Sequence, residues 1–251
     1  MPKYESFDEL LRTYLLAQEE KASKERDPDW WWASELGTCM RKQFLRRLGI
    51  KPKEKQWRIT FIAEQGKAIH SWIQNIVKNT GRLIAAEEEL RDENLRYKGK
   101  FDLIVNLNEK NKPYLSLVDL KTQRSEAFFR RAKDPATAKV KEFQKMQLAS
   151  YFLFARRKYP DLKDARIYYL DRGGGVREEF VFKFKPEMFK KVLDELTLLN
   201  DYWSKKILPP CNHTWECKEW CDFYKKECEK IEKGELSLDE FVLKFKNKQN
   251  K

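Results

Sequence analysis

Two acidic residues on neighbouring predicted strands, with a lysine beside one of them, are the strongest chemical signal in the sequence. Residues 113–122 form an apolar run whose polar end holds Asp119 and Lys121. Side chains alternate along a strand, so these two point to the same face. Asp102 lies on the preceding predicted strand, 99–107, and the connection between the strands is short and polar. A hairpin there would bring Asp102 and Asp119 together at one end of a sheet.

This acid–lysine pair has two interpretations. Carboxylates placed close together suit a hard divalent cation. At the end of an apolar strand such charged groups are costly unless something uses them. The alternative is an ion pair on an edge strand that has no catalytic role.

Composition and charge favour a polyanionic partner. The chain has 251 residues, a net charge of +12, 37% charged residues and 41% hydrophobic residues. This is the balance of a soluble globular protein, and the positive charge favours nucleic acid. From Lys121 to Lys145 there are eight Lys or Arg against three Asp or Glu. The alternative is a lysine-rich surface of the kind found in thermophiles.

The sequence shows no membrane signal. No apolar run approaches the roughly 20 residues that a membrane span needs. The first residues, Met-Pro-Lys-Tyr-Glu-Ser, lack the apolar core of a signal peptide. We therefore expect a cytoplasmic, intracellular protein, and a viral origin stays open.

Hydrophobic spacing predicts alternating helices and strands. Helices are expected over 7–21, 34–48, 57–78, 137–158 and 186–204, and strands over 83–90, 99–107, 113–122, 166–170 and 176–184. In the helix over 57–78 we expect the inward residues to be Ile62, Ile69, Trp72, Ile73 and Ile76. Trp30 to Trp32 are either a stacking platform for bases or a lid on the core.

Five cysteines are unevenly placed. Cys39 stands far upstream, whereas four cysteines fall within eighteen residues near the C-terminus: Cys211, Cys217, Cys221 and Cys228. In an intracellular chain this clustering favours a metal site over disulfides. Buried cysteines without a metal are the alternative.

The motifs, taken in order, resemble the RecB-like branch of the PD-(D/E)XK nuclease superfamily. The chain offers Gly66-x-x-x-His70 on a helix, an acidic strand, Gly99-x-x-Asp102, Asp119-x-Lys121 and Gln147-x-x-x-Tyr151 on a later helix. The cysteine arrangement is similar to that of the four-cysteine iron–sulfur exonucleases. These include the AddB nuclease domain, CRISPR-associated adaptation nucleases and their phage and archaeal-virus relatives. The resemblance covers about residues 34–228.

The resemblance implies an α/β fold with a restriction-endonuclease-like core, in which helices flank a central mixed β-sheet. We expect an N-terminal helical region over 1–55 that contributes Cys39 and a nuclease core over 56–204. A cysteine-rich, clamped segment would follow over 205–230, and then a charged tail over 231–251.

The resemblance also implies a metal site for Mg²⁺ or Mn²⁺. The ligands would be His70, Asp102, Asp119 and the backbone carbonyl of Leu120, with Lys121 acting beside them. Carboxylate and carbonyl oxygens suit these ions, and one imidazole is tolerated. Glu88 is a further candidate, although three adjacent glutamates, 87–89, leave the choice open. The residues expected to contact DNA are Gln147, Tyr151, Arg124, Arg130 and Arg131.

For the cysteines, the resemblance implies a 4Fe-4S cluster held by Cys39, Cys217, Cys221 and Cys228. The family's tail spacing is nearer C-x2-C-x5-C, so each gap here is one residue longer. Cys211 is an alternative ligand. Structural Zn²⁺ is an alternative metal, since four thiolates serve it equally well, and His213 lies close by in the sequence.

Three functions follow from these patterns. The first is a metal-dependent DNA exonuclease that acts on single strands or DNA ends. The second is a DNA-end-binding component of a recombination, replication or CRISPR adaptation complex, with little cleavage of its own. The third is a scaffold stapled by structural zinc.

Overall fold

The computed structural model describes residues 6–25, 27–49, 57–107, 112–124, 140–173, 175, 177–211, 225–237, 239–240 and 243. Within them the order of elements is α1 Phe7–Glu25, β1 Trp31–Trp32, the 3-10 helix Ala33–Glu35, α2 Met40–Arg47, α3 Trp57–Asn79, β2 Leu83–Ala86, β3 Glu89–Asp92, β4 Tyr97–Lys100, β5 Leu103–Asn106, β6 Leu115–Gln123, α5 Glu142–Ala155, β7 Leu162–Asp171, β8 Arg177–Phe182, α6 Pro186–Ser204 and α8 Lys225–Glu232. No helix in this described part is long and apolar enough to cross a membrane.

The larger sheet has five strands in the order β2-β5-β6-β7-β8. The predicted hairpin is confirmed, because β5 and β6 pair antiparallel with Leu103 opposite Val118. Strands β6 and β7 pair in parallel, and such a pair needs a crossover, in which α5 lies. The sheet is therefore mixed, as expected for the α/β core, and β6 lies at its centre.

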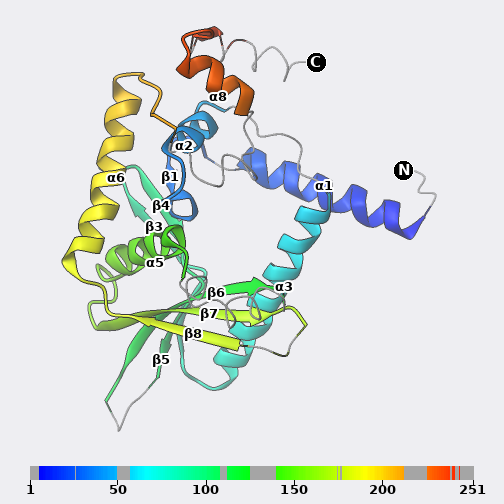
Figure 1. Cartoon of the computed structure of the whole chain (residues 1–251). Coiled ribbons are helices and arrows are strands. Elements are labelled where there is room, and N and C mark those ends of the chain that lie inside the picture. The colour runs from blue at the N-terminus through cyan, green and yellow to red at the C-terminus, as the bar shows by residue number, and fades with distance from the viewer. Residues whose placement is uncertain are drawn as a thin grey trace, which may run out of the picture.

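Helices cover both faces of this sheet (Figure 1). One face carries Leu103, Val105, Val118 and Leu120, which pack with Ile73 and Val77 of α3. The other face carries Ile104, Leu117, Ala165, Ile167 and Tyr169, which join a larger core with α5 and α6. The alternation of buried residues along β5 and β6 thus gives two apolar layers. Asp119 follows Leu117 by two positions and so points toward α5.

A second, three-stranded sheet has the order β1-β4-β3. Its strand β1 contains Trp31, which is 1% exposed and lies in the main core. Trp30 and Trp32 are half-buried, and their indole nitrogens donate to the Asp27 carboxylate and carbonyl, respectively. Trp31 is therefore part of the core, whereas the roles predicted for Trp30 and Trp32 stay predictions.

The strand predicted over 83–90 is wrong in detail. It is two strands, β2 and β3, which belong to different sheets. The chain turns between them at Glu87, whose φ of 55° lies in the left-handed region that non-glycine residues seldom adopt. The strand predicted over 99–107 is likewise divided, and Phe101 and Asp102 lie between β4 and β5. Both breaks occur beside the candidate site.

The inward face predicted for α3 is also partly wrong. Trp72 and Ile76 are 60% and 45% exposed. The sheet-facing stripe of α3 instead contains His70 and Gln74 together with Ile73 and Val77. Polar residues occupy part of that stripe because they face the site. The exposed apolar residues lie on a neighbouring face of the helix, turned away from the sheet.

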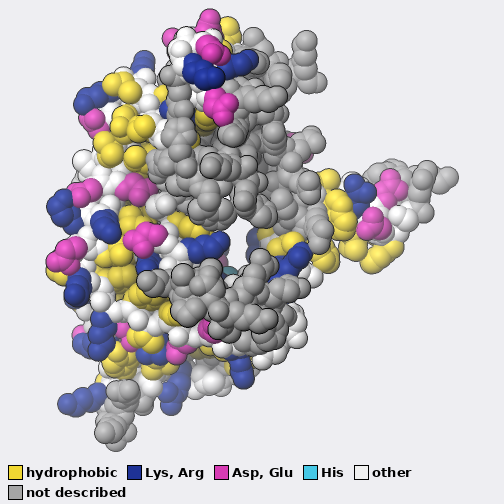
Figure 2. Space-filling view, in the orientation of Figure 1, with side chains coloured by type: hydrophobic (Ala, Val, Ile, Leu, Met, Phe, Trp, Pro, Cys, Tyr) yellow, Lys and Arg dark blue, Asp and Glu magenta, His cyan; other side chains and the backbone are white. Residues whose placement is uncertain are grey.

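Helix α1 carries further exposed apolar side chains where it projects from the rest of the molecule (Figure 2). Phe7 and Tyr14 are 74% and 59% exposed, whereas Leu15 is buried. The predicted helix over 7–21 is confirmed, but only part of its apolar stripe is covered by described residues.

Candidate active site

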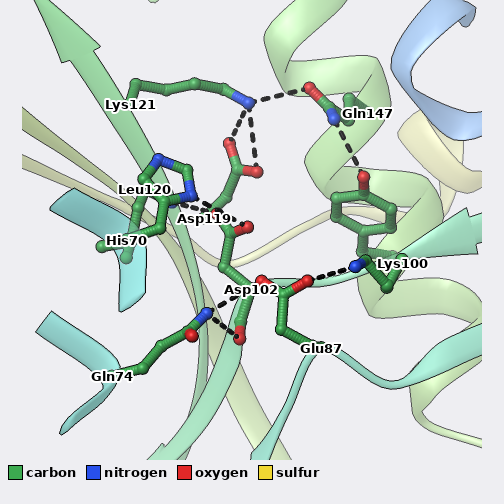
Figure 3. Close-up of polar contacts among 10 residues, drawn as sticks. His70, Gln74, Glu87, Lys100, Asp102, Asp119, Leu120, Lys121 and Gln147 are labelled. Carbon is green, nitrogen blue, oxygen red and sulfur yellow. Dashed lines mark hydrogen bonds and ion pairs between the residues drawn. The ribbon is translucent and has the colours of Figure 1, made fainter. Parts of the chain in front are cut away.

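Asp119 and Lys121 lie at the centre of a polar chain that runs from β6 to α5 (Figure 3). The Lys121 ammonium lies 3.1 Å from Asp119 Oδ1 and 2.9 Å from Asp119 Oδ2. It also donates to Gln147 Oε1 at 3.0 Å, and Gln147 Nε2 donates to the Tyr151 hydroxyl at 2.9 Å. The predicted same-face placement of Asp119 and Lys121 therefore holds, and Gln147 fixes the position of the ammonium.

Asp102 joins the same site from the start of β5. Its Oδ2 accepts the backbone N–H of Leu120 at 2.6 Å, and its Oδ1 lies 3.4 Å from Nδ1 of His70. Strand β5 begins at Leu103, opposite Val118, so β6 continues past it without a β5 partner. In a strand the N–H and C=O of one residue point to the same edge. The Leu120 carbonyl therefore lies on the edge of β6 that faces Asp102.

A glycine lets α3 bring His70 to the sheet. A Cβ atom added to Gly66 would lie 3.2 Å from Thr122 Oγ1, which is tighter than ordinary contact. Gly66 precedes His70 by one helical turn, so both face the end of β6. Gly66 thus allows the close approach of helix and strand that places the imidazole beside Asp102.

Burial and charge set the protonation of the site. Asp119 is 2% exposed, and this burial raises its pKa to about 6, although the Lys121 ammonium pulls it down. For His70, burial alone would lower the pKa, but the hydrogen bond and charge of Asp102 outweigh it, and the net pKa lies above 6.5. Both pKa values are raised, so protons compete with a metal ion for these two ligands at higher pH than they would at the ordinary pKa values.

The donor set fits a hard divalent cation. Both Asp119 oxygens lie against the Lys121 ammonium, and an ionised carboxylate has about four lone-pair sites, so Asp119 has acceptor capacity to spare for a cation. No group of three or more His, Cys, Asp or Glu side chains in the described residues is arranged to hold a metal by itself. Mg²⁺ needs only one or two carboxylates and takes its other ligands from carbonyls, substrate and water. Asp102, Asp119 and the Leu120 carbonyl satisfy that requirement.

The predicted DNA-contacting residues fall in different places. Gln147 and Tyr151 are buried within the polar chain and reach Lys121 from α5. Arg124 is exposed just after β6. Arg130 and Arg131 lie outside the described residues, so their assignment stays a prediction.

Three of the five cysteines lie within the described residues. Cys39 directly precedes α2 and is 6% exposed, Cys228 on α8 is 9% exposed, and Cys211 is half-buried. Cys217 and Cys221 lie outside the described part of the chain, as does His213. The predicted choice of cluster ligands therefore stays a prediction.

Comparison with known proteins decides the family. A family model described as the PD-(D/E)XK nuclease superfamily matches residues 78–240, well over half of the chain. The chain belongs to the PD-(D/E)XK nuclease superfamily. The matched span includes Asp102, Asp119 and Lys121 and begins after His70. A search of curated proteins found no match.

Two solved structures share the fold of this PD-(D/E)XK chain. A protein solved as SSO0001 is 19% identical, with a TM-score of 0.53, and the match covers 87% of this chain and 96% of that one. An alkaline exonuclease from Laribacter hongkongensis is 10% identical, with a TM-score of 0.51, and the match covers 74% of this chain and 93% of that one. At these identities the likeness shows the fold alone.

The structure separates the three adjacent glutamates among which the sequence left the choice open. Glu87 accepts a hydrogen bond from Gln74 at 2.8 Å, pairs with Lys100, and lies beside Asp102 (Figure 3). Glu88, the candidate named from sequence, points instead to Lys158 and Tyr159. The alternation of a continuous strand would not separate them, because the left-handed turn at Glu87 redirects the chain.

Glu87 and Glu88 form a matched pair for mutation. We expect Glu87→Gln to slow DNA cleavage about tenfold, because it removes negative charge next to Asp102 and frees Lys100 to compete for that carboxylate. Glu88→Gln should leave cleavage within twofold of wild type, since Glu88 faces away from the site. The test is kcat/KM for DNA cleavage by both variants, and a larger loss in Glu88→Gln would reverse the assignment.

Metal binding should strengthen as pH rises. Between pH 6 and pH 8, the protonated fraction of Asp119, whose pKa is about 6, falls from about one half to near zero, and His70, whose pKa Asp102 raises, also loses protons. Both losses expose metal ligands, so Mn²⁺ affinity should rise about tenfold over that range. The dissociation constant measured at the two pH values tests this. In His70→Gln the rise should shrink to the smaller part due to Asp119, and an unchanged rise would exclude His70 as a ligand.

Proposed function

We propose that the protein is a divalent-metal-dependent DNA exonuclease that hydrolyses phosphodiester bonds on single-stranded DNA or at DNA ends. The observation that carries the proposal is the convergence of Asp102, Asp119 and Lys121 at one strand end, with the Asp119 carboxylate almost fully buried. Charged groups gathered in this way at the buried end of an apolar strand are costly unless something uses them.

Each residue has a role in this proposal. Asp102, Asp119 and the Leu120 carbonyl would hold Mg²⁺ or Mn²⁺, with His70 as a further ligand. The bound cation supplies activation of a water molecule and neutralisation of phosphate charge. Lys121, held by Gln147 at 3.0 Å, is placed to donate to the phosphate oxygen on which negative charge develops. Asp119 holds that ammonium in position.

DNA is the substrate that the chain's charge favours. A net charge of +12 attracts a polyanion over several ångströms, and Arg124 extends this charge from the end of β6. The fold that the chain shares with the alkaline exonuclease from Laribacter hongkongensis supports the proposal that it is an exonuclease. Preference for ends or single strands is part of the proposal.

Digestion of end-labelled DNA tests the proposal. Linear single-stranded and double-stranded substrates, and a closed circle, are incubated with Mg²⁺ or Mn²⁺, with EDTA as the control. We expect release of label from linear DNA only, and none with EDTA. Cleavage of the circle would indicate an endonuclease. Binding of DNA ends without any product would favour the end-binding role in a recombination, replication or CRISPR adaptation complex.

The proposal includes a structural metal–thiolate centre, a 4Fe-4S cluster or alternatively Zn²⁺. Support comes from Cys39 and Cys228, which are both buried on segments that the Arg41 side chain joins. The four-part division of the chain, with the nuclease core over 56–204 and the cysteine-rich segment over 205–230, belongs to the same proposal. Metal analysis and a visible spectrum of anaerobically purified protein separate iron–sulfur from zinc.

A further inference from the structure

A buried arginine connects α2 to the C-terminal segment. Arg41 is 5% exposed and lies in the first turn of α2, two residues after Cys39. Its Nε donates to the Pro209 carbonyl at 2.8 Å, and its Nη1 lies 3.5 Å from the Cys228 carbonyl. These carbonyls are 168 and 187 residues away along the chain. One guanidinium therefore contacts two stretches of the C-terminal segment at once.

The arginine lies where the cysteines gather. Cys39 precedes it by two residues, Cys211 follows Pro209 by two residues, and Cys228 supplies one of the carbonyls. Each hydrogen bond therefore fixes the backbone next to, or at, a cysteine. In Figure 1, α8 lies beside α2, in agreement with the Cys228 contact.

Helix α2 is the fixed side of this contact. The loop before it is held by Glu195 of α6, whose carboxylate accepts the Gly37 N–H at 3.0 Å and the Gln43 side chain at 3.1 Å. Phe44 and Leu45 of α2 are 2% and 0% exposed. The helix is thus built into the core, and the C-terminal segment docks onto it.

We propose that Arg41 is a positioning residue that docks the C-terminal segment on α2 before any metal binds, and so presets the thiolate site. This inference rests on the proposed metal–thiolate centre. A planar guanidinium bonds two carbonyls in fixed directions, which a lysine ammonium at the same place does not reproduce. A docked segment also lowers the entropy cost of bringing Cys39 and Cys228 together, because the loop between them is already closed.

Arg41→Lys in the full chain tests the proposal, with Arg46→Lys as the matched control. Arg46 lies on the same helix, but it pairs with Glu35, and lysine keeps that ion pair. Hydrogen exchange of the α8 amides is measured in protein freed of metal by EDTA under reducing conditions. We expect at least tenfold faster exchange in Arg41→Lys and less than a twofold change in the control. Zinc affinity of the metal-free protein should fall at least tenfold in Arg41→Lys alone.

Exchange of the β6 amides in the same samples reports on the core. Loss of protection confined to α8 supports positioning by Arg41. An equal loss in β6, or exchange in Arg41→Lys that matches the control, overturns it. If wild-type protein binds neither iron nor zinc, the metal–thiolate proposal fails on its own, and α8 exchange in the metal-free protein still decides whether Arg41 docks the segment.

Discussion

Asp119→Asn is expected to abolish DNA cleavage while making the fold more stable. The neutral amide removes a charged ligand from the metal site and the partner of Lys121, so kcat/KM should fall at least about 10³-fold. Stability should move the other way. The folded pKa of Asp119 is about 6, against an ordinary value of 3.8, so its ionised form opposes folding at pH 7. Two pKa units correspond to about 3 kcal/mol, which is the upper limit of the gain.

The pH dependence of stability tests whether ionised Asp119 opposes folding. Because the folded state binds the Asp119 proton more tightly than the unfolded state, this residue's contribution to stability falls as pH rises from about 4 to about 6. Asp119→Asn should lack that fall, so its advantage should be absent near pH 4 and full at pH 7. Urea unfolding at the two pH values, together with a cleavage assay, makes both measurements.

Asp164→Asn is the matched control, since Asp164 is also a buried aspartate and lies on the adjacent strand. Asp164 accepts hydrogen bonds from the Tyr114 hydroxyl at 2.9 Å and from Arg166 Nη2 at 3.1 Å. Its carboxylate is already engaged in hydrogen bonds within the fold. The amide should therefore lower stability by about 1–3 kcal/mol and leave kcat/KM of the folded enzyme unchanged. A stable, active Asp119→Asn enzyme would show that the acid–lysine pair is only structural.

The central hairpin is predictable from sequence because its signals are local. The apolar run that ends in Asp119 and Lys121 needs only the two-residue period of a strand to place both side chains on one face. A short polar connection then places Asp102 within reach, and the pairing of β5 with β6 confirms that arrangement. The catalytic hypothesis therefore rests on features that a few neighbouring residues determine.

The position of Glu87 could not be predicted from the local sequence. Three consecutive glutamates have the same residue type and propensity, so only the path of the backbone decides which one meets Asp102. That path changes at the positive φ of Glu87, which the packing of two different sheets stabilises. Helix α3 is likewise predicted only in part, because His70 and Gln74, and not the apolar Trp72 and Ile76, occupy the sheet-facing stripe. A functional site overrides the amphipathic pattern there.

Gly99→Ala is expected to cause a large loss of stability. A Cβ atom at Gly99 would lie 2.6 Å from the Tyr97 hydroxyl, 2.9 Å from Ala33 Cβ and 2.9 Å from Tyr151 Cε1. All three neighbours are buried, and none is the free end of a flexible chain. Overpacking of this kind costs about 1–3 kcal/mol, and the three contacts together place the loss at the upper end.

The same substitution should reach the active site through Tyr151. The added methyl group pushes the Tyr151 ring, whose hydroxyl accepts a hydrogen bond from the Gln147 amide nitrogen. The Gln147 amide oxygen in turn accepts a hydrogen bond from Lys121. We therefore expect a cleavage defect in the protein that remains folded, with metal affinity preserved because Asp102 is untouched. Gly175→Ala is the control, since a Cβ atom there meets nothing within 4 Å. Equal melting temperatures for the two variants would show that the Gly99 contact is not tight. The proposed effect of a methyl group on β4 on the position of Lys121 would then be wrong.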